Sequence, residues 1–99
     1  MFKVTLETTR KDTSVLWEDP SIDISKVFNV LTQASGYGIQ VRESLSDDNL
    51  TRSLVWTAPS EEGWDEFSTK YILKDGKIDD SWFISNDITF TITRENIDE

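Results

Sequence analysis

Apolar and polar residues alternate in four short stretches of the chain, and each alternation predicts a β-strand. The first covers residues 2–7, in which every second residue is apolar. Residues 37–42 and 50–57 follow a similar period, and the turn-forming residues 46–49 lie between them, so this pair predicts a β-hairpin. Residues 88–93 alternate isoleucine or phenylalanine with threonine, a composition with high β propensity.

A helical spacing of apolar residues predicts the first helix, at about residues 22–35. The sequence Asp-Pro-Ser at 19–21 is a helix start signal, and Gly36 is a suitable stop. Between these signals, apolar residues form one stripe, which we expect to face the core. Its members are Ile24, Val27, Phe28, Leu31 and Ala34.

The stretch LVWTAPSEEGWDEF, residues 54–67, runs from a strand into a second predicted helix at about residues 60–69. Ser60 can cap this helix by accepting a hydrogen bond from a free backbone N–H, and two glutamates follow it in the first turn, where acids are favourable. One face of the helix carries the aromatic residues Trp64, Phe67 and Tyr71.

The connections leave some alternatives open. After the second helix, either the helix continues to about Lys74, or the Asp-Gly pair at 75–76 turns a small hairpin. We favour the shorter helix, with residues 71–84 extended or irregular. Residues 15–17 either extend the first strand or form a short one of their own. Residues 95–99 are expected to be a frayed acidic tail.

The predicted order is β-α-β-β-α-β, which is the ferredoxin-like α+β arrangement of a single domain spanning residues 1–99. Two helices would cover one face of a four-stranded antiparallel sheet. The other face would be open to solvent or to a partner. Side chains that tolerate water on that face are Thr5, Gln40, Arg42, Ser53, Thr89 and Thr91, whereas Val55 and the surplus tryptophans are candidates for a patch covered by a partner.

Composition narrows the chemistry. The chain has no cysteine and no histidine, which excludes thiol nucleophiles, thiolate zinc sites, histidine bases and the Ser-His-Asp triad. Its 19 acidic and 10 basic residues give a net charge of −9, which repels nucleic acid and anionic membranes. We therefore expect no direct nucleic-acid binding and no membrane association. The sequence shows neither a signal peptide nor an apolar run long enough to span a bilayer, so a cytoplasmic protein is expected.

The segment LTRSLVWTAPSEEGWDEF, residues 50–67, resembles the dimeric α/β-barrel superfamily, and within it the antibiotic-biosynthesis-monooxygenase-like domains. A hairpin strand that ends in a tryptophan, followed by a Ser-Glu-Glu-led helix with an aromatic residue, recurs there. The resemblance implies a ferredoxin-like fold and dimerisation through the sheet. Several members perform cofactor-free oxidations or bind haem. This chain has no histidine to bind haem iron, so the resemblance supports the fold and dimer more than catalysis.

The four tryptophans are many for 99 residues and are the first candidates for a ligand pocket. Trp56 and Trp64 are expected to be core residues, whereas Trp17 and Trp82 lie in irregular context and are open to either role. A pocket between sheet and helices would be lined by Trp17, Arg42, Trp56, Trp82 and Asn86.

Other possible sites have ordinary structural explanations. The acid pairs at 47–48 and 79–80 lack calcium-loop spacing and are typical of solvated loops, so we expect no metal and no other cofactor. Arg42 and Arg52 could clamp an anion from paired strands, but cross-strand pairing of these arginines with Glu43 or Thr51 is the simpler interpretation. The glycines at 36 and 38 lie between helix and strand, which is the wrong order for a dinucleotide loop.

These observations favour a non-enzymatic protein-binding or assembly module that forms a homodimer through its sheet and has a possible further protein partner. Mimicry of nucleic acid by the acidic surface is a special case of this hypothesis. The alternative is a cofactor-independent monooxygenase-like enzyme or a small-ligand binder. A solvent-open pocket with polar groups would favour the alternative, whereas a filled core with an apolar dimer face would exclude it.

Overall fold

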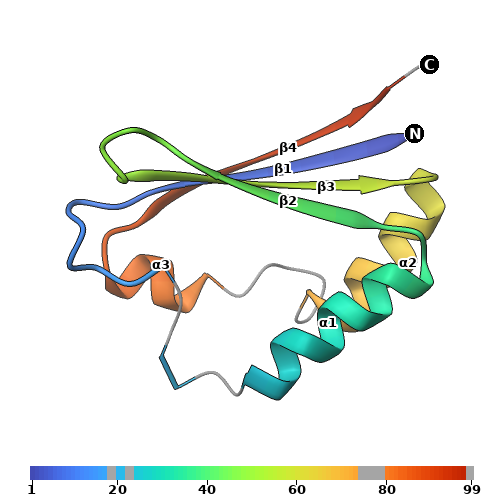
Figure 1. Ribbon diagram of the computed structural model, residues 1–99, viewed down its shortest axis with the longest axis horizontal. Coiled ribbons are helices and arrows are strands. Elements are labelled where there is room, and N and C mark those ends of the chain that lie inside the picture. The colour runs from blue at the N-terminus through green and yellow to red at the C-terminus, as the bar shows by residue number, and fades with distance from the viewer. Residues whose placement is uncertain (18–19, 22–23, 74–79, 98–99) are drawn as a thin grey trace.

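The computed structural model describes the whole chain except residues 18–19, 22–23, 74–79 and 98–99 (Figure 1). A curved sheet forms one layer, and the helices lie together on one side of it. The elements in chain order are β1 (Phe2–Thr9), α1 (Ile24–Gly36), β2 (Gln40–Leu45), β3 (Thr51–Ala58), α2 (Glu61–Tyr71), α3 (Ser81–Ser85) and β4 (Thr89–Asn96).

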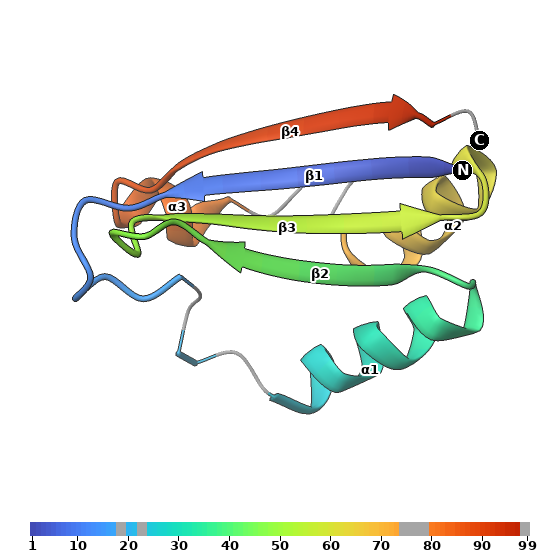
Figure 2. The ribbon, with the colours of Figure 1, turned by 45° about the horizontal axis from the view of Figure 1, so that its top comes forward.

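The sheet confirms the predicted ferredoxin-like arrangement. Its strand order is β2-β3-β1-β4, and all three neighbouring pairs are antiparallel. β1 pairs with β3 and with β4 along its full length, from Phe2 to Thr9. The two strands nearest the chain ends thus lie side by side in the middle and at one edge of the sheet (Figure 2).

The two faces of the sheet have different compositions. Phe2 and Val4 of β1 are buried toward the helices, and their cross-strand partners Ala58 and Trp56 lie on the same face. The other face is not covered by any described helix. It carries mostly hydroxyl and charged side chains, which include all six positions predicted to tolerate water: Thr5, Gln40, Arg42, Ser53, Thr89 and Thr91.

The core is centred on α2, which begins as predicted. The Ser60 hydroxyl accepts a hydrogen bond from the Gly63 N–H at 3.1 Å, which supplies one of the partners that a helix N-terminus lacks. Phe67 is completely buried. Its ring lies 5.7–5.9 Å from four other aromatic rings, those of Tyr37, Trp56, Trp64 and Tyr71.

α1 is only partly packed against the sheet. Ala34, near its C-terminal end, is buried in the core, and Val30 packs against it. Nearer its N-terminal end, Val27 and Leu31 are 39% and 42% exposed, and Phe28 is 61% exposed. Figures 1 and 2 agree that the helix approaches β2 at its C-terminal end and diverges from the sheet toward its N-terminus. The prediction that Phe28 faces the core is therefore wrong.

Several predicted boundaries also differ. Residues 15–17 form no strand, because β1 ends at Thr9 and the chain then turns away. Ser81–Ser85 forms the short helix α3 where irregular chain was expected, and its Phe83 ring stacks 5.3 Å from the Phe90 ring of β4. β4 continues to Asn96 because β1 pairs with it throughout, so the acidic tail begins later than predicted. The alternatives for residues 74–76 lie outside the described residues.

Arg10 joins two loops at the end of β1. Its Nε and Nη2 donate to the Asn49 carbonyl at 3.0 and 2.8 Å, and its Nη1 donates to the Val15 carbonyl at 2.7 Å. The guanidinium carbon also lies 4.4 Å from the centre of the Trp17 ring, a cation–π contact. The β2–β3 turn and the loop after β1 are thus tied to one buried side chain.

An apolar groove as the candidate functional site

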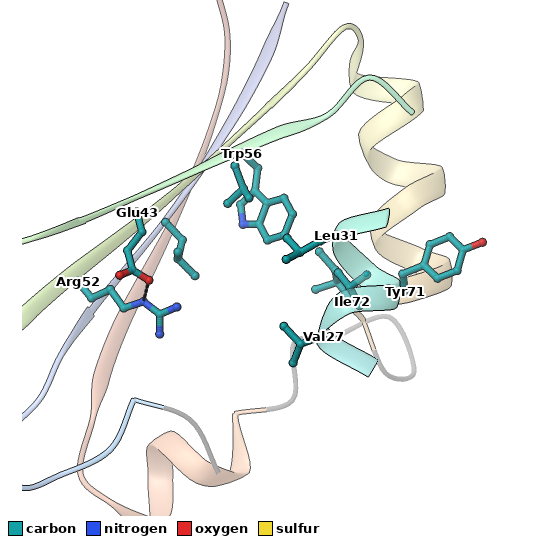
Figure 3. A pocket seen from close by; sticks show the side chains of 10 residues that line it. Val27, Leu31, Glu43, Arg52, Trp56, Tyr71 and Ile72 are labelled. Carbon is teal, nitrogen blue, oxygen red and sulfur yellow. Dashed lines mark ion pairs between the residues drawn. The ribbon is translucent and has the colours of Figure 1, made fainter. Parts of the chain in front are cut away.

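A groove of about 540 Å³ lies between α1 and the covered face of the sheet. Val27 and Leu31 of α1 form one wall, and Trp56 extends toward them from the sheet (Figure 3). Val41, Leu54 and Ile72 complete a lining that is mostly apolar. The groove follows directly from the course of α1, because a helix that diverges from a sheet leaves its apolar stripe and the facing strands uncovered.

A second hollow of about 360 Å³ lies on the other side of Trp56, beneath β1 and β4. It shares Leu54, Trp56 and Ile72 with the first groove, so these three residues form a common wall. Trp56 thus lies between two adjoining, mostly apolar hollows under one small sheet, and both are partly open to solvent.

One ion pair lies at each hollow. In the larger groove, Glu43 Oε2 lies 3.1 Å from Arg52 Nε. The pairing is diagonal, since Glu43 stands opposite Leu54 on β3, two residues along from Arg52. In the smaller hollow, Arg94 Nη2 lies 2.7 Å from Asp65 Oδ1. The charged side chains in the two linings thus form pairs of opposite charge beside an apolar surface.

The carboxylates that line the two hollows are both held in ion pairs. Glu43 is paired with Arg52 at the larger groove, and Asp65 is paired with Arg94 at the smaller hollow. Within the described part of the chain, no three acidic side chains gather as a metal site would require. Its helices also include none with the length and hydropathy of a membrane span.

The structure brings only one of the five predicted pocket residues to the groove. Trp56 lines both hollows and faces the helices, as expected. Arg42 stands opposite Val55 on the open face of the sheet. Because Arg52 lies on the covered face, the two arginines cannot clamp one anion between them. The alternative, pairing of Arg52 with Glu43, is confirmed.

The other three predicted residues gather around α3 and the loop after β1, and none of them lines either hollow. Trp17 packs on the Arg10 guanidinium. The Trp82 indole N–H donates to the Leu16 carbonyl at 2.9 Å, and the Asn86 amide donates to the Trp82 carbonyl at 2.9 Å. Trp17 and Trp82 thus make contacts that hold the loop after β1, whereas Asn86 bonds back to α3 at its C-terminal end.

Sequence reasoning did not single out Val27, Leu31 or Ile72 as site residues, and it considered Arg52 only as half of an anion clamp with Arg42. The apolar stripe of α1 was recognised, but it was assigned to the core. The sequence did contain one signal for the groove, which is the large number of apolar residues on this stripe. To bury all of them, the helix would have to contact the sheet along its whole length, but α1 does so only near its C-terminal end.

No protein-family model matches the chain, and no curated protein sequence matches it. The protein is therefore defined by its fold and its groove: an α+β ferredoxin-like domain with an apolar hollow between its sheet and its first helix.

Proposed function

We propose that the protein is a non-enzymatic binding module that holds a small apolar ligand in the groove beneath its sheet. The observation that carries this proposal is the 540 Å³ groove itself, bounded by α1 on one side and by β2 and β3 on the other. Its volume falls within the range of about 300–1,000 Å³ typical of small-molecule sites. The lining combines aliphatic side chains with two aromatic residues, Trp56 and Tyr71, and a single ion pair, a composition such sites commonly have.

The half-exposed side chains of α1 support the same proposal. Val27 and Leu31 keep apolar surface in contact with water although the sheet opposite them is also apolar. A ligand that fills the space would remove both surfaces from water at once, which is favourable by roughly 25 cal/mol for each Å² buried. The apolar surface that α1 and the sheet leave exposed is therefore available to stabilise a bound ligand.

A pair of adjacent substitutions tests the proposal. Leu54 borders both hollows, whereas Val55 points to the opposite face of the sheet. We expect Leu54→Trp to fill the groove and to weaken binding of decanol, a neutral apolar probe, by about tenfold or more. Val55→Trp should leave the affinity unchanged. Fluorescence titration measures both, since Trp56 lines the groove, and circular dichroism checks that both variants fold. Equal effects of the two substitutions would contradict the proposal.

We also propose that the chain is related to the dimeric α/β-barrel proteins. The ferredoxin-like topology and a cavity between sheet and helices support it. The homodimer through the sheet is a second candidate function for the protein, and the uncovered sheet face is the observation that favours it.

The chemistry of that face predicts a weak dimer at most. Val55 is an apolar residue among hydroxyl and charged neighbours such as Thr5 and Arg42, so pairing two such faces would bury little apolar surface. At micromolar concentration we expect light scattering to give the monomer mass of 11.4 kDa. Twice this mass, reduced to the monomer value by Val55→Asp, would instead support assembly through the sheet.

A further inference from the structure

The ion pair in the larger groove places its two charges in different environments. The Arg52 side chain is 14% exposed, whereas the Glu43 side chain is 51% exposed. Arg52 therefore holds its positive charge beside the apolar lining, and the Glu43 carboxylate lies next to it (Figure 3). A charge that has lost its water needs an anionic partner, because an uncompensated buried charge is strongly destabilising.

A ligand could supply that partner. The Glu43 side chain is 51% exposed, so its carboxylate can return to water when a ligand carboxylate takes its place beside Arg52. A ligand carboxylate would offer Arg52 the same two oxygen acceptors in its place. We propose that the ligand of the groove is an apolar molecule that carries a carboxylate, which replaces Glu43 as the partner of Arg52. This inference rests on the proposed function of the same groove.

The local charges favour an anion over a cation. A cationic ligand would compete with Arg52 for the Glu43 carboxylate and would bring a second positive charge near the Arg52 guanidinium at an apolar wall. The net charge of −9 slows the approach of an anion over long distances, but salt screens this repulsion beyond about 10 Å. The contact with Arg52 acts within the groove, where screening is weaker.

Decanoate and decanol test the inference because they share the same apolar chain and differ in charge. Arg52→Gln should weaken decanoate binding by about tenfold or more, the usual effect of losing a charge-assisted hydrogen bond, and leave decanol binding unchanged. Glu43→Gln removes the competing carboxylate and should tighten decanoate binding only. Arg42→Gln makes the same charge change on the opposite face of the sheet, and should alter neither affinity.

The outcomes separate this inference from the proposed function. Suppose that decanol binds but that neither Arg52→Gln nor Glu43→Gln changes decanoate binding selectively. This result would overturn the carboxylate inference and leave the apolar site intact. Failure of both probes to bind would overturn the proposed function as well. Tighter binding of decyltrimethylammonium that depends on Glu43 would overturn the inference in favour of a cationic ligand. If Arg52→Gln does not fold, the half-exposed Glu43→Gln decides the question alone.

Discussion

Replacing Phe67 by alanine is expected to lower the free energy of unfolding by about 3–5 kcal/mol, the usual cost of removing a buried aromatic side chain. Phe67 has no exposed surface, and four aromatic rings surround it at 5.7–5.9 Å. Removal of its ring would leave a cavity that these rigid neighbours cannot readily close. Because domains of this size are stable by only about 5–15 kcal/mol, the variant should retain a small part of its stability.

Phe28→Ala is the matched control for this prediction. The same side chain is removed, but Phe28 is 61% exposed on α1, so the loss should stay below about 1 kcal/mol. Urea unfolding, followed by tryptophan fluorescence and circular dichroism, measures both variants. Similar losses for the two substitutions would show that the core is not centred on Phe67.

Replacing Arg10 by alanine is the second change with a large expected effect, a loss of about 2–4 kcal/mol. The substitution removes three hydrogen bonds to the carbonyls of Asn49 and Val15, together with the contact to the Trp17 ring. Those carbonyls would lose their donors at a site that is partly buried. Since the loop after β1 and the β2–β3 turn meet at this side chain, we expect faster hydrogen exchange in both of them.

Arg42→Ala serves as the control, because Arg42 is an exposed arginine on the open sheet face. Its removal should change stability by less than about 0.5 kcal/mol. Thermal unfolding and hydrogen exchange of the two variants provide the comparison. If Arg10→Ala lost no more stability than Arg42→Ala, or left exchange in both loops unchanged, Arg10 would not be the junction described above.

The topology was predictable because it depends on local patterns. Alternation at residues 2–7 and 88–93 identifies the strands at the two ends of the chain, and Ser60 identifies the start of α2. The short helix α3 was missed because five residues are too few to display a helical stripe, and its contact between Phe83 and Phe90 depends on the tertiary fold.

The groove could not be predicted for a different reason. The periodicity of α1 shows which face is apolar, but it contains no information on the angle at which the helix meets the sheet. That angle leaves Val27 and Leu31 half-exposed while Ala34 is buried. The pairing of Arg52 with Glu43 was among the predicted interpretations, but its place at a groove could not be predicted, because it depends on the register that sets both residues on the covered face. Trp56 was identified because a tryptophan on a covered strand face must contact whatever lies beneath it.

The most direct test of the apolar site is an NMR titration of isotope-labelled protein with decanol. We predict saturable shifts that concentrate on the Trp56 indole N–H and on Leu31, Leu54 and Ile72, which line the larger groove. Residues of the open face, such as Thr5, should be unaffected. Shifts confined to the open face, or the absence of any saturable shift, would contradict the assignment of this groove as a ligand site.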